Sequence, residues 1–237
     1  MKLLAIETST EACSIALWID GEVRERHELA PRRHAELALS WCDALLAEAG
    51  IAKRALDAIA VGRGPGAFTG VRLGVALAQG MALALDRPVL PVSTLAALAM
   101  GAPGPADAAV LAMIDARMGE LYVGLFERTA DGLVVPLGDE SLWSPATSEP
   151  LAIGSDTLVG IGSGFRSEAG REFSGTMQAC DPDGLPHGAD VARLAAQAWV
   201  RGEAIAPDLL EPAYLRDKVA LTLSEQRAAK AKGPATP

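Results

Sequence analysis

GRGPGAFTG, at residues 62–70, is the stretch of sequence on which the fold depends. It follows an apolar run at residues 56–61, which predicts a buried strand. It precedes residues 71–85, where apolar residues recur at helical spacing and small ones such as Gly74 and Ala78 allow close packing. A strand, a glycine-rich turn and a helix in this order are typical of an α/β protein.

The glycine-rich turn has two interpretations. Gly64 and Gly66 are candidate binding residues, because backbone N–H groups ahead of a helix can hold an anion against its positive end. The turn lacks the Gly-Lys-Ser/Thr ending of a P-loop, however. In the alternative, which we favour, Gly64-Pro65-Gly66 sets a tight turn, Thr69 caps the helix and Phe68 fills the core.

A β-meander is expected upstream of this turn. Its predicted strands are residues 3–7, 12–19 and 22–28. Asp20-Gly21 is a strong hairpin signal between the last two strands. A helix is then expected at residues 33–49, with Gly50 at the position where a left-handed cap usually ends a helix.

The same pattern restarts downstream. The further predicted strands are residues 88–92, 110–115, 121–127, 133–137 and 157–161. A last helix is expected at residues 189–200. Two meanders, each followed by a helix, indicate an internal duplication of the fold. The intervening GAPGP at residues 101–105 cannot hold regular structure, so it marks a domain boundary.

These elements divide the chain into four segments. We expect a first domain at residues 1–102, which carries the partner-binding helices, and a second domain at residues 103–188. Residues 189–215 should form a C-terminal helix and extension that pack back on the body, and residues 216–237 a flexible tail. The net charge of −9 divides into −12 for residues 1–215 and +3 for the tail.

The composition excludes several classes of protein. A net charge of −9 argues against a free-standing nucleic-acid binder. Three cysteines with no C-x-x-C predict neither a disulfide framework nor a zinc knuckle, and so indicate a reducing, cytoplasmic location. Charged residues interrupt the apolar stretches, so no window approaches the ~20 apolar residues that span a bilayer. None of the three histidines is three or four residues from another, so no helix presents a pair of imidazoles to a metal.

Two acidic turns are weak candidates for binding phosphate. Glu7 and Thr8 follow the first strand, where an ATPase of the actin, hexokinase and Hsp70 type places its first nucleotide loop. Such loops need an Asp followed by Gly, and this one has neither, so a simple tight turn is the favoured interpretation. Asp115 follows a later strand in a comparable way, and a plain turn is at least as good an explanation there.

The helix expected at residues 33–49 has two apolar stripes, although a helix lying on a sheet needs only one. We assign the sheet-facing stripe to Leu39, Cys42, Leu46 and Ala49. The second stripe consists of Leu37, Trp41, Ala44 and Leu45. It is available to a neighbouring helix or to another protein, and an exposed Trp is typical of an interface hot spot.

Four motifs together resemble the TsaB family, formerly called YeaZ. They are residues 6–10 (IETST), 62–72 (GRGPGAFTGVR), 114–117 (IDAR) and 212–216 (PAYLR). The match runs in order to about residue 216, and the long glycine-rich motif is highly specific. The resemblance implies an α/β fold of two ASKHA-type domains, the actin- and Hsp70-like class, with mixed sheets flanked by helices.

The resemblance also implies a function. TsaB proteins are required to add threonylcarbamoyl to an adenosine beside the anticodon of certain tRNAs, together with the catalytic subunit TsaD and the ATPase TsaE. TsaD holds a metal with a His-x-x-x-His pair, and the corresponding positions here resemble Thr94 and Leu98, which cannot replace imidazoles. The resemblance therefore implies a cytoplasmic, non-catalytic subunit with no metal and no cofactor of its own. A nucleotide at the junction of the complex is left open.

We therefore expect a scaffold that dimerises with TsaD and activates it, with a homodimer as the alternative state and tRNA contacted only through the complex. The expected interface residues are Leu37, Trp41 and Leu45 on the first helix and Leu73, Leu77 and Met81 on the second. One rival is an ATP-binding phosphotransferase or ATPase that uses Glu7, the glycine-rich turn and Asp115. The other is a metallopeptidase, or glycoprotease, which we disfavour because the sequence offers no ligand set.

Overall fold

The computed structural model describes residues 1–148 and 157–216. The first sheet has the strand order β3-β2-β1-β4-β5. Its strands are β1 (Lys2–Glu7), β2 (Ala12–Ile19), β3 (Glu22–Leu29), β4 (Ala58–Gly62) and β5 (Val89–Val92). β1, β2 and β3 form the expected antiparallel meander, whereas β4 and β5 run parallel to β1. Asp20 and Gly21 turn the hairpin with φ of 49° and 107°, as a type I′ turn requires.

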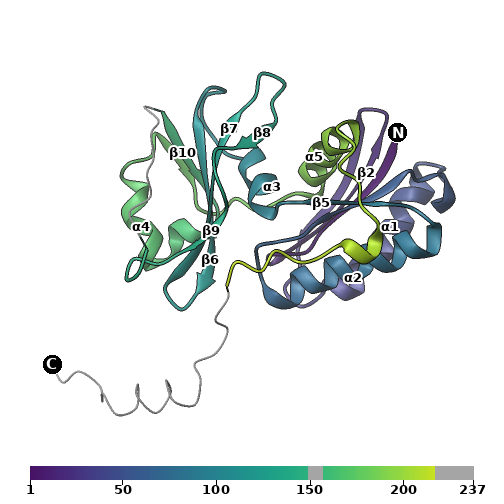
Figure 1. Cartoon of the computed structure of the whole chain (residues 1–237), viewed down its shortest axis with the longest axis horizontal. Helices are drawn as coiled ribbons and strands as arrows, with labels where there is room; N and C mark the ends of the chain where they lie inside the picture. The colour runs from purple at the N-terminus through teal and green to yellow at the C-terminus, as the bar shows by residue number, and fades with distance from the viewer. Residues whose placement is uncertain (149–156, 217–237) are drawn as a thin grey trace, which may run out of the picture.

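The second sheet repeats this connectivity. Its strand order is β8-β7-β6-β10-β11, with β9 as an extra strand on β7. The strands are β6 (Ala109–Arg117), β7 (Glu120–Arg128), β8 (Val134–Pro136), β9 (Ser141–Trp143), β10 (Leu158–Ile161) and β11 (Ala179–Asp181). β6 is again the central strand, antiparallel to β7 and parallel to β10. The sheets form two lobes side by side (Figure 1), and their shared order supports the expected duplication.

Helices cover both faces of the first sheet. The helices are α1 (His34–Glu48), α2 (Phe68–Leu85), α3 (Thr94–Met100), α4 (Glu168–Ser174) and α5 (Gly188–Val200), and the short 3-10 turns are η1 (Lys53–Ala55), η2 (Ser163–Arg166) and η3 (Pro207–Leu209). α1 and α2 share a core with Leu4 and Ile6 of β1 on one face. α5 covers the other face, where Leu3 and Ala5 point. This alternation explains why β1 is apolar without interruption from Leu3 to Ile6.

The two lobes exchange helices. α3 follows the last strand of the first sheet, yet Leu95 and Leu98 pack in the core of the second sheet. α5 follows the last strand of the second sheet and returns to the first, where Val191 and Ala195 are buried. Ser93 caps α3, since its Oγ accepts a hydrogen bond from Ala96 N at 3.0 Å. The result confirms the expected class, an α/β protein with two mixed sheets flanked by helices.

The chain after α5 forms a strap that crosses the first lobe and ends at the second. Ile205 pairs with Val89 at the edge of β5, and Gln79 of α2 donates hydrogen bonds to the carbonyls of Pro207 and Leu210. Arg216 donates to Ala116 O and to Glu120 Oε2, at 2.8 and 2.6 Å. The expected flexible tail at residues 216–237 is therefore wrong for Arg216, and its remainder lies outside the described residues.

α2 is more apolar than the sequence analysis allowed when it found no stretch that could span a membrane. Among the described residues it is the one helix long and apolar enough, by length and composition, to cross a membrane. The core helix of a globular domain passes the same test, and α2 buries Val75, Ala78 and Ala82 against the first sheet. α2 is therefore apolar on two sides. A buried stripe packs on the sheet, and the outer face is also apolar, although packing on the sheet does not require it.

Candidate functional site

The turn after β1 and the glycine-rich turn before α2 lie against each other. Ala67 N donates a hydrogen bond to Ser9 O at 2.7 Å, and Thr8 Oγ1 donates to Gly70 O at 2.8 Å. The two turns that we considered as phosphate loops are thus bonded to one another. The N–H of Ala67 therefore donates to the protein's own backbone and is not free to bind a phosphate.

Glycines make this contact possible. A Cβ on Gly66 would be 2.3 Å from Ser9 O, and a Cβ on Gly70 would be 2.1 Å from Thr8 O. Real Cβ atoms do not approach backbone oxygens so closely, so these positions require glycine. Gly64 adopts a φ of +96°, which is left-handed and strained for other residues. This geometry favours the tight-turn interpretation over an anion site.

Two details of that interpretation are wrong. Phe68 was expected to fill the core, but its side chain is 64% exposed. Thr69 was expected to cap α2, but the N-cap is Ala67, and α2 has no side-chain cap among the described residues. Phe68 is instead the first residue of α2 and lies under the guanidinium of Arg72, 3.2 Å from its ring centroid. The helix starts one turn earlier than the apolar spacing indicated.

Glu7 is fully buried beneath these turns. Its Oε1 accepts Ser9 N at 2.6 Å, and its Oε2 accepts Thr94 Oγ1 at 3.0 Å. Burial raises the pKa of Glu7, although these hydrogen bonds partly offset the effect. Thr94 and Leu98, the positions that resemble the metal ligands of TsaD, are also buried, at 0% and 1% exposure. Thr94 completes a polar cluster around Glu7, and Leu98 packs in the core of the second sheet.

A cleft of about 1280 Å³ lies between the two lobes. Of the five candidate binding residues, Gly66 and Asp115 line it, whereas Glu7 and Thr8 are buried below and Gly64 is buried in its turn. The Asp115 carboxylate binds its own turn, since Oδ1 accepts Arg117 N at 2.8 Å. The structure therefore brings only two of the five candidates to a shared open space.

The cleft walls carry cations and exposed aromatic rings. Arg72 lies between Phe68 and Tyr214, whose ring centroid is 5.1 Å away. Tyr214 belongs to the C-terminal strap and is 58% exposed. Arg166 of the second lobe forms an ion pair with Glu11 of the first, at 3.5 Å. The cleft is thus partly closed by contacts between the lobes and by the strap.

The predicted partner-binding residues on α1 need correction. Leu37 and Leu45 are 8% and 2% exposed and belong to the core of the first sheet. Leu39, which we assigned to the sheet-facing stripe, is 49% exposed. The buried residues of α1 are Leu37, Ala38, Cys42, Leu45 and Leu46, so the sheet takes Cys42 and Leu46 from the stripe that we assigned to it and Leu37 and Leu45 from the other. Trp41 is half-buried at the edge of this core.

The predicted residues on α2 lie at a partly open surface. Leu73, Leu77 and Met81 are half-buried, and several residues beside them on α2 are exposed. Those exposed residues include Ala76, Gly80, Leu83 and Ala84. We call the set consisting of Trp41, Leu73, Ala76, Leu77, Gly80, Met81, Leu83 and Ala84 the α1–α2 surface. It is apolar along its length, and small residues alternate with large ones.

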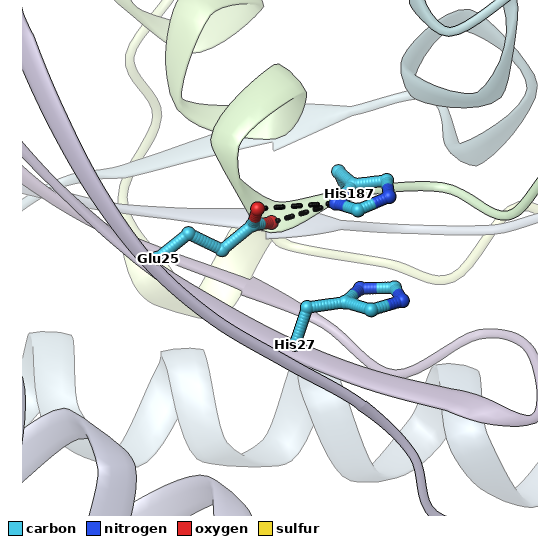
Figure 2. Close-up of side chains that lie close together, drawn as sticks. All are labelled: Glu25, His27 and His187. Atoms are coloured by element: carbon cyan, nitrogen blue, oxygen red, sulfur yellow. Dashed lines mark hydrogen bonds and ion pairs between the residues drawn. The ribbon is translucent and has the colours of Figure 1, made fainter.

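Sequence reasoning missed a cluster on the opposite face of the first sheet. His27 of β3 stacks on His187, the N-cap residue of α5, with ring centroids 4.0 Å apart (Figure 2). Glu25 lies two residues before His27 and accepts Nδ1 of His187 at 3.1 Å. The spacing of histidines along a single helix does not reveal this cluster, because His27 is in a strand and His187 precedes a helix. No local signal links His27 to His187, because the fold brings them together from distant parts of the chain.

The pKa values of all three side chains in this cluster are shifted from their ordinary values. Burial opposes ionisation of Glu25, but hydrogen bonds from His187, Ser14 and Ala189 lower its pKa to about 2. The hydrogen bond to Glu25 raises the pKa of His187. Burial and the neighbouring His187 lower the pKa of His27. Glu25 therefore pairs with His187, while His27 favours its neutral form.

The duplicated fold, with two mixed sheets on either side of a cleft, defines a protein of the ASKHA class. Residues 26–145 match the family model described as TsaD, tRNA N6-adenosine threonylcarbamoyltransferase. The chain is 40% identical to the tRNA threonylcarbamoyladenosine biosynthesis protein TsaB of Escherichia coli, over 93% of this chain and 96% of that one. It is 36% identical to TsaB of Haemophilus influenzae, over 92% and 95%.

A solved structure agrees with these relatives. YeaZ from Pseudomonas aeruginosa matches with a TM-score of 0.79 at 42% identity, over 90% of this chain and 99% of that one. The chain belongs to the TsaB family of tRNA threonylcarbamoyladenosine biosynthesis proteins. This finding confirms the family that the four sequence motifs indicated.

Proposed function

We propose that this chain is a non-catalytic subunit of the tRNA threonylcarbamoyladenosine machinery, and that it binds and activates a TsaD-type threonylcarbamoyltransferase through the α1–α2 surface. The observation that carries this proposal is the outer face of α2. Leu83 is 65% exposed, and Ala76, Gly80 and Ala84 are exposed beside it. An apolar face of this kind on a chain with a complete core of its own is typical of a protein interface.

The small residues favour a helix as the partner element. A Cβ on Gly80 would meet nothing within 4 Å in the isolated chain, so its own fold gives no packing reason for glycine there. Small side chains allow two helices to approach closely, and Leu77 and Met81 flank the gap. The match to the TsaD model spans both α1 and α2, so a TsaD-type protein has equivalent helices. Two such faces can pack around a pseudo-twofold axis.

The environment of Glu7 and Thr94 supports the absence of catalysis. Both side chains are buried and hydrogen-bonded to each other, so neither faces a substrate in the cleft. Gly66 and Gly70 of the glycine-rich turn are in close contact with the backbone of Ser9 and Thr8, so packing alone accounts for these glycines. We assign these residues a role in holding α2 against β1, which fixes the orientation of the α1–α2 surface.

The remaining partners follow from this role. We propose that TsaE joins the assembly and that tRNA is bound through the complex, since a body of charge −12 is unsuited to bind phosphates alone. We place the assembly in the cytoplasm. The α1–α2 surface is also available to a second copy of this chain, so a homodimer would compete with the heterodimer for the same face.

The ATP-binding alternative has one observation in its favour, the Arg72, Phe68 and Tyr214 stack in the cleft. A calorimetric titration of the isolated chain with Mg-ATP decides between the two. Micromolar binding together with turnover would favour an ATPase. We expect neither, because the carboxylate of Glu7 is buried and its oxygens are occupied.

Reconstitution tests the proposed function. The chain is mixed with TsaD, TsaE, tRNA and threonylcarbamoyl-adenylate, and formation of modified adenosine is measured. We expect no product from the chain alone and a rate that depends on its presence in the complete mixture. Product from the chain alone, or full activity without it, would contradict the proposal.

A further inference from the structure

We propose that Glu25, His27 and His187 form a binding site for a divalent transition-metal ion of the zinc type, which ties β3 to the start of α5. The three side chains each offer a ligand atom, and these atoms lie within 4.8 Å of one another. This proposal is independent of the function proposed above and concerns the opposite face of the first sheet.

The backbone places these side chains on one side. Glu25 and His27 are two residues apart in β3, so both point to the same face of the sheet. That face is covered by α5, and His187 is the N-cap residue of α5. Figure 2 shows both imidazoles and the carboxylate gathered where the helix begins above the strand. The convergence is therefore set by a strand and a helix terminus, which are rigid elements.

The Glu25 and His187 pair already has the spacing of metal ligands. His187 Nδ1 lies 3.1 Å from Oε2 and 3.2 Å from Oε1 of Glu25. Two ligands bound tetrahedrally to zinc at ~2.0–2.1 Å are ~3.3 Å apart. A zinc ion that displaces the proton between Nδ1 and the carboxylate would therefore need only a small shift of either group.

Neighbouring groups orient the carboxylate. Glu25 Oε1 accepts hydrogen bonds from Ser14 Oγ at 2.6 Å and from Ala189 N at 3.1 Å. Ser14 Oγ in turn accepts Gly188 N at 2.8 Å. These bonds occupy Oε1 and hold the plane of the carboxylate, while Oε2 has only His187 as a partner among the described residues. Support of this kind around a ligating group is a regular feature of metal sites.

A second observation, which does not depend on the spacing of Glu25 and His187, concerns the side chain of His27. Its Nδ1 is buried, and it has no hydrogen-bond partner among the residues that the structure describes. A buried polar atom without a partner costs free energy, and an ion would provide that partner. The ring is stacked on His187 with an interplanar angle of 12°, so the His27 ring has to tilt out of this stack for its nitrogen to share an ion with His187.

The donor set selects the class of ion. Two imidazole nitrogens and one carboxylate oxygen suit Zn²⁺, Co²⁺ or Ni²⁺, whereas Mg²⁺ and Ca²⁺ prefer oxygen ligands alone. The side chain of His187 is 40% exposed, which leaves a path for the ion and a fourth position for solvent. The bound ion would link residues 25 and 187 and so anchor the helix that returns from the second lobe.

Metal titration of the full chain tests this site. Protein treated with a chelator and then dialysed is titrated with Zn²⁺ by calorimetry and with Co²⁺ by visible absorption. We expect one ion per chain, and at least ~10-fold weaker binding in His27→Gln and in His187→Gln. His34→Gln is the matched control, because His34 bonds the carbonyls of Thr10 and Ala12 and lies outside the cluster. It should bind as the wild type does.

Two results would overturn the site: no stoichiometric binding by the wild type, or binding that is unchanged in both cluster variants. If His187→Gln fails to fold, His27→Gln decides, because Nδ1 of His27 has no hydrogen bond to lose among the described residues. Zinc at a given concentration should also raise the melting temperature of the wild type more than that of His27→Gln. A metal bound at this cluster would give no support to the metallopeptidase alternative, since Thr94 and Leu98, the positions that resemble the metal ligands of TsaD, are not among its ligands.

Discussion

Gly62 lies directly against Glu7, so that a Cβ built on Gly62 would be 1.8 Å from Oε2 of Glu7. Neither partner can retreat, because Gly62 is in β4 and the carboxylate is fixed by Ser9 and Thr94. We predict that Gly62→Ala lowers the free energy of unfolding by about 3 kcal/mol. Urea unfolding measures this directly, as a lower midpoint at unchanged slope.

Gly80→Ala is the matched control for that substitution. Gly80 is within α2, and a Cβ there would meet nothing within 4 Å. Alanine in a helix interior is favoured over glycine by about 0.8–1 kcal/mol, so this variant should be more stable than the wild type. Equal effects of the two substitutions would contradict the packing role that we assign to Gly62.

Glu7→Gln should change how stability depends on pH. Burial raises the pKa of Glu7 above its usual value of 4.5, so the folded state favours the protonated carboxyl. That contribution is complete below pH 4.5 and is lost as the pH rises through the folded pKa. The Gln variant lacks this loss, so its stability relative to the wild type should increase with pH in this range.

Urea unfolding at a series of pH values from 4.5 upward checks this prediction. Glu36→Gln is the control, because Glu36 is an exposed side chain in the first turn of α1. It should follow the wild-type pH profile. Parallel profiles for Glu7→Gln and the wild type would show that ionisation of Glu7 does not oppose folding.

Leu37 and Leu39 test the corrected face of α1. Leu37 is 8% exposed and belongs to the core, so Leu37→Ala should destabilise the fold by about 2–5 kcal/mol. Leu39 is 49% exposed, so Leu39→Ala should change stability by less than about 0.5 kcal/mol. Thermal or urea unfolding of the two variants is sufficient. A larger loss for Leu39 would restore the original assignment of the stripe.

Much of the fold was predictable from local signals. Asp20-Gly21 turns its hairpin as expected, and the restarted meander after residue 105 forms the second sheet. These features depend on turn chemistry and on alternation along short segments, which a single sequence records well. The return of α5 to the body of the protein was expected. The packing of α3 on the second sheet was not, because nothing in the sequence of α3 indicates which sheet it covers.

The site was less predictable, because its features depend on contacts between distant segments. The glycines of the 62–70 turn allowed either a phosphate loop or the tight turn that we favoured, and the approach to Thr8 and Ser9 supports the tight turn. The assignment on α1 was correct for Cys42 and Leu46 and wrong for Leu39, because residues of both apolar stripes pack on the sheet. His27 and His187 are 160 residues apart and have no shared motif.

The affinity between this chain and its TsaD-type partner tests the central claim most directly. Trp41→Ala is a useful variant, but Trp41 also packs against the core of its own domain. Gly80→Arg is cleaner, because position 80 is open in the isolated chain. We predict that Gly80→Arg raises the Kd of the complex about 100-fold, or about 2.7 kcal/mol. Gln197→Arg, an exposed position on α5, should bind normally. An unchanged Kd for Gly80→Arg in a folded protein would contradict the assignment of the α1–α2 surface as the partner-binding face.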